Sequence, residues 1–218
     1  MGRPPLDLTL YLVTDTRLCG AVGVATTAAR AVRGGATVVQ LRDPDCTDEE
    51  LVRLGRSLRE ALPPGLPLIV DDRAHLVSAI GADGVHVGQH DEQPEVVRAL
   101  VGDDAYVGLS VQTVEHVDRA LSLPRGTVDY LGVGPVWPQS TKHDAAEASG
   151  PETLARIVRH SPWPCVAIGG IDAARVRDVR RTGAHGVAVV SAVCGQPDVE
   201  AATRRLREAW DQHRGGEP

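Results

Sequence analysis

Short runs of apolar residues alternate along the chain with longer stretches in which apolar residues recur every three or four positions. The short runs are rich in Val, Leu and Ile and predict β-strands, because branched side chains favour an extended backbone. The longer stretches predict amphipathic helices, and in one of them Leu51, Leu54, Leu58 and Leu62 mark a single face. The pattern therefore indicates a regular alternation of strands and helices.

Eight strand–helix pairs follow one another in this pattern. The strands are expected at residues 8–15, 37–43, 67–72, 84–88, 106–111, 130–136, 164–170 and 186–193. The helices are expected at residues 23–33, 48–62, 74–80, 94–100, 114–121, 152–159, 173–181 and 199–210. Alternating strands and helices form parallel βαβ units, and eight units without a second domain favour a closed barrel. We expect an α/β fold in which residues 1–218 form a single (β/α)8 TIM barrel domain.

Composition and charge narrow the classes of function. Hydrophobic residues make up 42% and charged residues 24% of the chain, an ordinary balance for a globular domain. The net charge of −6 argues against a nucleic-acid binder, and no apolar run is long enough to span a membrane. No signal peptide is evident, and Cys19, Cys46, Cys165 and Cys194 are scattered without metal-binding spacing. These features predict a cytoplasmic protein.

Polar residues and glycines gather where the predicted strands end. In (β/α)8 barrels the catalytic groups lie at these carboxyl ends and in the loops after them. The residues at these positions are Asp15, Gln40, Arg42, Asp71, Asp72, Gln89, Asp91, Ser110, Gln112, Lys142, Gly169, Gly170 and Ser191. This set combines carboxylates with anion-binding groups, which is typical of sites for phosphorylated small molecules.

Asp72 and Asp91 follow neighbouring strands and are candidate metal ligands. Two carboxylates that face one cavity repel each other unless a cation lies between them, and ligation by oxygen alone suits Mg²⁺. A plainer alternative for Asp71 or Asp72 is that it caps the helix that follows. That alternative explains Asp91 poorly, because the next helix is expected to begin only near Pro94.

Two cations and a glycine pair are candidates for binding phosphate groups. Arg42 ends an apolar strand and is expected to point into the barrel mouth, while Lys142 lies beyond the sixth strand. Arg offers a rigid fork to phosphate oxygens and Lys a point charge. The seventh strand ends in Gly169 and Gly170 and the eighth near Ser191, and barrels often bind phosphate through backbone N–H groups in the loops after these two strands. No HxH or HExxH pattern suggests zinc.

Seven segments in order, covering nearly the whole chain, resemble the thiamine-phosphate synthase (thiamine phosphate pyrophosphorylase) family. They are VVQLRD (38–43), IVDD (69–72), GVHVGQHD (84–91), GLS (108–110), DYLGVGPVWPQSTKHD (129–144), AIGGI (167–171) and GVAVVSAV (186–193). The combination of GxHxGQxD, GPxxPxxTKxD and AIGGI is fairly specific. The resemblance implies a transferase that joins 4-amino-2-methyl-5-(diphosphooxymethyl)pyrimidine to a thiazole phosphate, forming thiamine phosphate and releasing pyrophosphate.

The resemblance also implies roles for individual residues. Asp72 and Asp91 would hold Mg²⁺, and the catalytic groups would be Arg42, Ser110 and Lys142. The pyrimidine diphosphate would contact Gln40, Leu41, Arg42, Asp43, Pro44, Asp71, Ser110 and Lys142. The thiazole phosphate would contact Gln139, Ser140, Thr141, Gly170, Val190 and Ser191. The expected partners are these small phosphorylated substrates, and the resemblance leaves room for a homo-oligomer.

Three positions depart from the family pattern. Pro44 stands where the family commonly has Lys, Asp71 where it has Asn, and Gln139 where it has Thr. Loss of a cation and gain of an anion both weaken the binding of a diphosphate unless another basic side chain compensates. Arg73 is the candidate for that compensation.

Other functions fit parts of the same pattern. A thiazole tautomerase shares the barrel but shifts a proton without Mg²⁺ or diphosphate, and it would place a His near the end of the fifth strand, where this chain has Gln112. Two further alternatives are another phosphate-binding barrel isomerase or lyase and a non-catalytic binder of a thiamine precursor. Turnover that requires Mg²⁺ and both substrates would separate the synthase from all of them.

Overall fold

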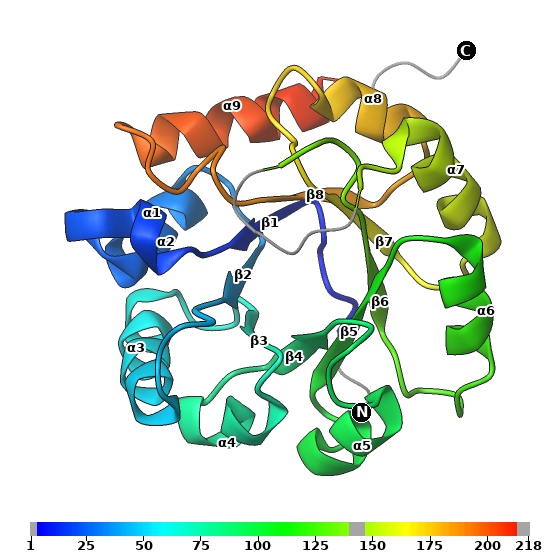
Figure 1. Ribbon diagram of the computed structural model, residues 1–218. Coiled ribbons are helices and arrows are strands. Elements are labelled where there is room, and N and C mark those ends of the chain that lie inside the picture. Colours follow the sequence, from blue (N-terminus) through cyan, green and yellow to red (C-terminus); the bar gives the residue numbers. More distant parts are fainter. Residues whose placement is uncertain (1–3, 140–146, 213–218) are drawn as a thin grey trace.

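The computed structural model describes residues 4–139 and 147–212, in which the expected strands close into one parallel barrel (Figure 1). The strands are β1 (Leu10–Val13), β2 (Val38–Leu41), β3 (Leu68–Asp71), β4 (Gly84–Val87), β5 (Tyr106–Val111), β6 (Tyr130–Val133), β7 (Cys165–Ile168) and β8 (Gly186–Val189). Each strand pairs with the next along the chain and β8 pairs with β1, so the sheet has no open edge. The prediction of a (β/α)8 barrel is confirmed.

Helices form a ring outside the barrel and return the chain to the start of the next strand (Figure 1). They are α1 (Thr16–Cys19), α2 (Val24–Arg33), α3 (Asp48–Ala61), α4 (Val77–Ile80), α5 (Pro94–Val101), α6 (Val114–Leu121), α7 (Gly150–His160), α8 (Val176–Arg181) and α9 (Val199–Asp211), with 3-10 helices η1 (Gly20–Val22) and η2 (Ala74–Leu76). Every predicted helical stretch contains a helix. The single turn α1 was not predicted, and it is capped by Asp15, whose side chain accepts a hydrogen bond from the Leu18 amide.

The strand residues divide between two apolar cores. Side chains that point outward pack against the helices in the larger core, which includes Leu10, Leu12, Val39 and Leu41. Side chains that point inward fill the barrel, and these include Tyr11, Val38, Ile69, Tyr106, Tyr130, Val166 and Ala188. The alternation follows from the two-residue repeat of a strand. With no Phe in the chain, tyrosines supply the bulk inside the barrel, and their hydroxyl groups then need polar partners.

The barrel closes where its first and last strands meet. Leu10 of β1 pairs with Val187 of β8, and the carbonyl of Leu8 approaches Gly186 so closely that a Cβ atom at Gly186 would overlap it. Glycine is therefore required at the first position of β8. The parallel pairing of β1 with β8 places the loop after β8 beside the loop after β1, at the same end of the barrel as the other strand ends.

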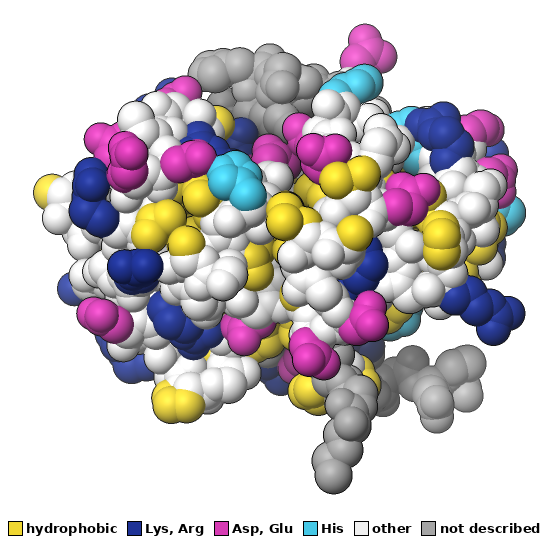
Figure 2. Space-filling model, turned by 90° about the horizontal axis from the view of Figure 1, so that it is seen from below, with side chains coloured by type: hydrophobic (Ala, Val, Ile, Leu, Met, Phe, Trp, Pro, Cys, Tyr) yellow, Lys and Arg dark blue, Asp and Glu magenta, His cyan; other side chains and the backbone are white. Residues whose placement is uncertain are grey.

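The outer surface mixes charged and apolar side chains. Figure 2 views the molecule from the side of α4 and α5, where hydrophobic side chains lie among acidic and basic ones. Among the residues that the structure describes, the large apolar side chains that are exposed are Val22, Val96, Leu100 and Leu121. Within residues 4–139 and 147–212, none of the helices has the length and hydropathy needed to cross a membrane.

Candidate active site

A cavity of about 560 Å³ opens at the carboxyl ends of the strands, a size suited to a small-molecule site. The residues expected there that line it are Gln40, Arg42, Asp71, Asp72, Gln89, Asp91, Ser110, Gln112, Gln139, Gly169, Gly170, Val190 and Ser191. Asp15 does not line the cavity, because it is buried as the cap of α1. Ser140, Thr141 and Lys142 lie outside the described residues.

A chain of hydrogen bonds forms the floor of the cavity. Gln40 Nε2 donates to the Tyr11 hydroxyl at 3.1 Å, and the Tyr11 and Tyr130 hydroxyls are 2.8 Å apart. Tyr130 Oη then lies 3.1 Å from Nδ1 of His86, whose Nε2 lies 2.9 Å from Ser110 Oγ. Because Gln40 donates to Tyr11, each following group can donate to the next, and the Ser110 hydroxyl hydrogen is left to point into the cavity. The chain thereby orients a candidate substrate contact.

Two glycines make room for the imidazole in this chain. A Cβ atom at Gly108 would overlap His86 and the phenol ring of Tyr130, and one at Gly132 would lie 2.8 Å from His86 Cε1. Gly108 lies on β5, next to β4, and Gly132 lies on β6, the following strand, and any larger residue at either position would push the ring away. Small residues inside the barrel are thus as necessary to the site as the polar ones.

The two tyrosines in the floor stay neutral. Burial is the main cause that raises the pKa of Tyr11 and of Tyr130 well above the usual value for a phenol. Asp71 also raises both pKa values, because a nearby carboxylate disfavours a phenolate. These residues therefore serve as hydrogen-bonding groups rather than as bases.

Arg42 and Asp71 form an ion pair at the wall beside this floor. Arg42 Nε lies 3.2 Å from Asp71 Oδ2, and the two side chains are 19% and 17% exposed. The pairing orients the guanidinium group and also neutralises part of its charge. Asp71, an anion in a predicted anion site, is therefore accommodated by the neighbouring arginine.

Asp72 and Asp91 both line the cavity, as the sequence predicts. Asp91 Oδ2 accepts a 2.7 Å hydrogen bond from the Gly88 amide, and a Cβ atom at Gly88 would lie 2.6 Å from that oxygen. Asp72 has a φ of 58°, a left-handed conformation that is strained for a residue other than glycine. η2 begins after Arg73, which has no side-chain cap, so Asp72 does not occupy the cap position considered as its alternative role.

The donor set of these two aspartates fits Mg²⁺. Among the described residues, no group of three or more His, Cys, Asp or Glu side chains is placed to hold a metal ion, so a metal here would have few protein ligands. Mg²⁺ commonly uses one or two carboxylates and takes its remaining ligands from substrate phosphates and water. A site of this kind is complete only when a phosphorylated substrate is bound.

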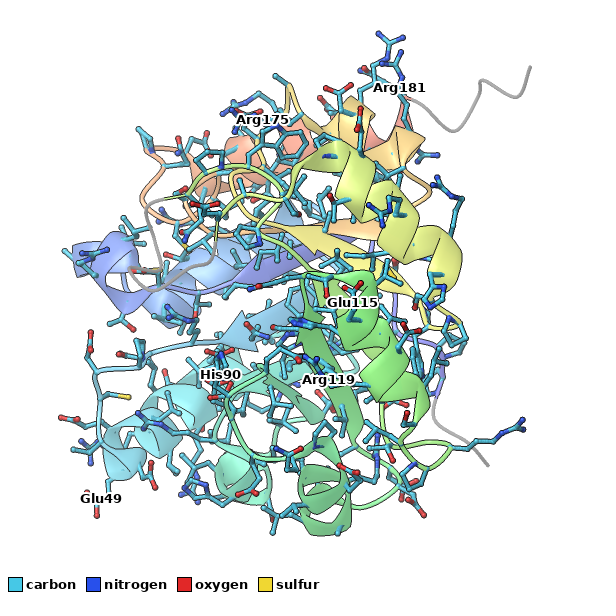
Figure 3. All side chains as sticks on the ribbon, turned by 45° about the vertical axis from the view of Figure 1, so that its right-hand side comes forward. Glu49, His90, Glu115, Arg119, Arg175 and Arg181 are labelled. Atoms are coloured by element: carbon cyan, nitrogen blue, oxygen red, sulfur yellow. The ribbon has the colours of Figure 1, made fainter. Side chains whose placement is uncertain are left out.

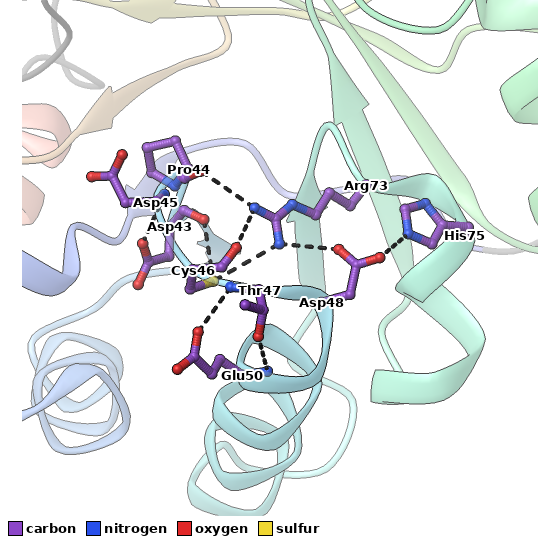
Figure 4. A network of polar contacts seen from close by, with 9 residues as sticks. All are labelled: Asp43, Pro44, Asp45, Cys46, Thr47, Asp48, Glu50, Arg73 and His75. Carbon is purple, nitrogen blue, oxygen red and sulfur yellow. Dashed lines mark hydrogen bonds and ion pairs between the residues drawn. The ribbon is translucent and has the colours of Figure 1, made fainter.

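The loop after β2 carries the other predicted diphosphate contacts and is held by Arg73 (Figure 4). Arg73 donates to the carbonyls of Pro44 and Cys46 at 3.3 and 2.7 Å and pairs with Asp48 at 3.1 Å. The Asp48 carboxylate also bonds His75, which is the main cause of its lowered pKa. Arg73 does not line the cavity, so its predicted role as the compensating cation is not supported.

The side chains of the 41–44 segment lie apart from the cavity, with the exception of Arg42. Leu41 is fully buried in the core between the strands and the helices. The Asp43 side chain accepts a hydrogen bond from the Asp45 amide at 3.3 Å. Any contact of Leu41 with a ligand in the cavity would therefore use its backbone.

The far wall of the cavity is built from backbone. Gly169 and Gly170 have φ values of 103° and 64°, which favour glycine. A Cβ atom at Gly170 would lie 2.6 Å from the Pro138 carbonyl oxygen, so the absence of side chains lets the loops after β6 and β7 touch. Trp137 N donates to Gly169 O at 3.1 Å, and Arg175 both bonds the Gly170 carbonyl and lies over the Trp137 ring.

Val190 and Ser191 complete this wall after β8. The amides of Val193 and Cys194 donate to the Val190 carbonyl at 3.0 and 2.8 Å, which turns the chain sharply at the cavity. Gln196 Nε2 donates to the Ser191 carbonyl at 2.8 Å and holds the turn. Gln139, Gly170 and Ser191 therefore lie along one side of the same cavity, as the phosphate prediction requires.

Several lining residues were not predicted as site residues. His86 and Tyr130 point inward from strands, and their signal was the alternation of inward and outward positions. His116 and Arg119 come from α6, which the sequence shows only as an amphipathic helix. Figure 3 shows Arg119 and His90 toward the middle of the molecule, whereas Arg181 lies at its outer edge.

Similarity to known proteins agrees with this geometry. A family model described as thiamine monophosphate synthase matches residues 10–193. The chain is 49% identical over 207 residues to the thiamine-phosphate synthase of Xanthobacter autotrophicus, covering 94% of this chain and 96% of that protein. It is 47% identical over 204 residues to the thiamine-phosphate synthase of Azorhizobium caulinodans, covering 93% and 95%. The structure of a thiamine phosphate pyrophosphorylase from Pyrococcus furiosus matches with a TM-score of 0.85 and 34% identity, covering 96% and 98%.

Proposed function

The chain belongs to the thiamine monophosphate synthase family, and we propose that the cavity at the strand ends is the active site of its transferase reaction. Its function is that of a thiamine-phosphate synthase, which couples the pyrimidine diphosphate to the thiazole phosphate. One observation carries the assignment of the site. Arg42, Asp72 and Asp91 line one side of a single cavity, and Gly170 and Ser191 line another.

The pyrimidine diphosphate occupies the side formed by β2 to β5. Gln40 and Ser110, at the two ends of the hydrogen-bonded floor, are suited to the polar edge of the pyrimidine ring. Arg42 meets the diphosphate with its side chain, and Leu41, Asp43 and Pro44 would contribute only their backbone. Asp71 sets the position of the Arg42 guanidinium. Lys142 completes this set in our proposal and lies outside the described residues.

The thiazole phosphate occupies the side formed by the loops after β6, β7 and β8. Gly170, Val190 and Ser191 present backbone there, which suits a phosphate group because amide N–H groups can approach its oxygens. Gln139 lies beside them, and Ser140 and Thr141 follow in the sequence outside the described residues. This division places the two reacting groups on opposite walls of one cavity.

Asp72 and Asp91 would hold Mg²⁺ against the diphosphate. The ion would neutralise charge that develops on the leaving diphosphate when it departs. The protein groups prepared for this site are the two carboxylates, of which Asp91 is held by the Gly88 amide. The remaining ligands would come from substrate and water.

The residues present suit a displacement that needs no strong base. The C–O bond to the diphosphate breaks, the aminopyrimidine ring stabilises the resulting cation, and the thiazole nitrogen forms the new C–N bond with its lone pair. Arg42 stabilises the departing anion, and the cavity holds the two substrates in line. The floor tyrosines are neutral, because burial raises the pKa of both phenols, so neither acts as a base.

Pyrophosphate release tests the proposal. Purified protein is given both substrates with Mg²⁺, and EDTA or omission of one substrate serves as control. We expect release only when both substrates and the metal are present. In parallel, Asp91→Asn keeps an oxygen that can accept from the Gly88 amide but loses the charge, and should lower kcat by about 100-fold or more. Unchanged turnover in this variant, with an unchanged circular dichroism spectrum, would refute the metal assignment.

The small phosphorylated substrates are the partners in this proposal. We also place the reaction in the cytoplasm, because all four cysteines are free thiols, which suits a reducing compartment. Gln112 at the end of β5 offers no imidazole for a tautomerase, so the coupling reaction remains the function that the cavity supports best.

A further inference from the structure

Two arginines line the cavity in the described part of the chain, and they differ in their partners. Arg42 is paired with Asp71 at 3.2 Å. Arg119 is exposed, and within residues 4–139 and 147–212 no carboxylate lies within ion-pair distance of it. Arg119 is thus the cavity arginine whose charge remains available to a ligand.

The guanidinium of Arg119 is held in place despite its exposure. Its Nη2 donates to Gln89 Oε1 at 3.0 Å, and Gln89 Nε2 donates to the Ser110 carbonyl at 2.7 Å. Both ends of the Gln89 amide are therefore engaged, which fixes the direction of the arginine fork and leaves its other N–H groups for a ligand. Gln89 stands two residues before Asp91, so Arg119 is tied to the loop that carries a proposed metal ligand.

The neighbouring histidine adds to this side of the cavity. His116 lies one turn before Arg119 on α6 and also lines the cavity. Its Nδ1 accepts from the Gln112 amide at 3.3 Å, so a neutral ring carries its hydrogen on Nε2. Burial and then the charge of Arg119 lower the pKa of His116, which keeps the ring neutral near pH 7. Arg119 is then the fixed positive charge of this wall.

We propose that Arg119 is a substrate-binding residue that contacts the diphosphate of the pyrimidine substrate from the α6 side of the cavity. The inference rests on the proposed function. It adds to the diphosphate site a cation that comes from α6, whereas Arg42 and Arg73 come from the ends of β2 and β3. Arg73 cannot serve, because its guanidinium is engaged by Asp48 and two backbone carbonyls away from the cavity. Arg42 and Arg119 would approach the diphosphate from two sides, with Asp72 and Asp91 between them in chain order.

Binding of inorganic pyrophosphate in the presence of Mg²⁺ tests this inference, together with steady-state kinetics. Arg119→Gln should weaken pyrophosphate binding and raise KM for the pyrimidine diphosphate by about tenfold, the loss expected for one charge-assisted hydrogen bond at an exposed site. KM for the thiazole phosphate should stay unchanged. Arg119→Lys keeps the charge but loses the planar guanidinium, so its Kd for pyrophosphate and its KM should lie between those of the unmutated protein and those of Arg119→Gln.

A matched control separates a local effect from loss of surface charge. Arg181→Gln removes an arginine at the outer edge, where it pairs with Asp178, and should change none of these constants. An unchanged Kd for pyrophosphate in Arg119→Gln would overturn the inference, as would an equal rise in both KM values. If the unmutated protein neither turns over nor binds pyrophosphate, the proposed function fails, and that failure is visible before any variant is made.

Discussion

The two walls of the cavity are built in different ways. The wall at β2 to β5 and α6 consists of charged and polar side chains, such as the Arg42–Asp71 pair, Asp91 and Arg119. The wall after β6 to β8 consists of backbone, brought close by Gly169 and Gly170. One wall owes its chemistry to side-chain charge and the other to the path of the chain.

Because of this difference, a substitution has different consequences on the two walls. On the side-chain wall, a cation can be lost at one position and supplied from another without any change in the fold. On the backbone wall, the loops after β6 and β7 touch through positions where a Cβ atom does not fit, so a substitution displaces the loops themselves. Of the departures from the family pattern, Asp71 and its partner Arg42 lie on the first wall, and Pro44 does not line the cavity.

The largest effect is expected from Gly170→Ala, which tests the backbone wall. The added Cβ atom would lie 2.6 Å from the Pro138 carbonyl oxygen at a φ of 64°, so the two loops must separate. We expect KM for the thiazole phosphate to rise more than tenfold, and the free energy of unfolding to fall by about 2–3 kcal/mol. Kinetics and urea unfolding measure the two effects.

Gly126→Ala is the matched control for this variant. Gly126 has a φ of 84° in an exposed loop, and a Cβ atom there meets nothing within 4 Å. It should lose about 1 kcal/mol of stability from backbone strain alone and keep both KM values. If Gly126→Ala and Gly170→Ala had the same KM for the thiazole phosphate, the proposed dependence of the backbone wall on Gly170 would be wrong.

A smaller effect, in the opposite direction, is expected from Asp71→Asn on the side-chain wall. Loss of the carboxylate frees the Arg42 charge for the diphosphate, so pyrophosphate should bind about three- to tenfold more tightly. Asp178→Asn, which breaks a surface pair with Arg181, should leave the affinity unchanged. Weaker binding in Asp71→Asn would show that orientation of Arg42 matters more than its free charge.

The smallest effect concerns the floor shared by both walls. Because the folded-state pKa of Tyr11 and Tyr130 is raised, their contribution to stability is complete below pH 10 and is lost as the pH rises further. Each tyrosine should lower the free energy of unfolding by up to about 1.4 kcal/mol per pH unit above pH 10. Tyr11→Phe should show a shallower loss between pH 10 and 11 in urea unfolding. An identical slope would mean that the phenol is not held neutral.

The fold could be read from the sequence because its signal repeats. Each strand–helix pair shows the same change, from a short apolar run to apolar residues at every third or fourth position. An error at one boundary therefore does not alter the number of strand–helix pairs. The single turn α1 escaped notice because four residues are too short for a helical period, and Asp15, which caps it, looks like any strand-end carboxylate. Its mistaken inclusion among the cavity residues follows from this.

The site could be predicted only in part, because strand ends are visible in a sequence and inter-element contacts are not. Asp72, Asp91 and Gly170 were predicted because each lies at the end of an expected strand or in the loop after it. Arg119 was not predicted to line the cavity, because its position there depends on which face of α6 meets the loop after β4. Arg73 was misjudged for the same reason: its position in the chain suggests the cavity, but its guanidinium turns to Asp48.

The contact of Leu10 with Val187 carries a consequence for how the molecule is made. The two residues pair across almost the entire chain, so the barrel cannot close until its last strand has left the ribosome. Until then β1 exposes an open edge, and contacts this distant in sequence slow the final step of folding. The cavity, which needs Val190 and Ser191 beside β1, therefore comes into existence only after synthesis is nearly complete.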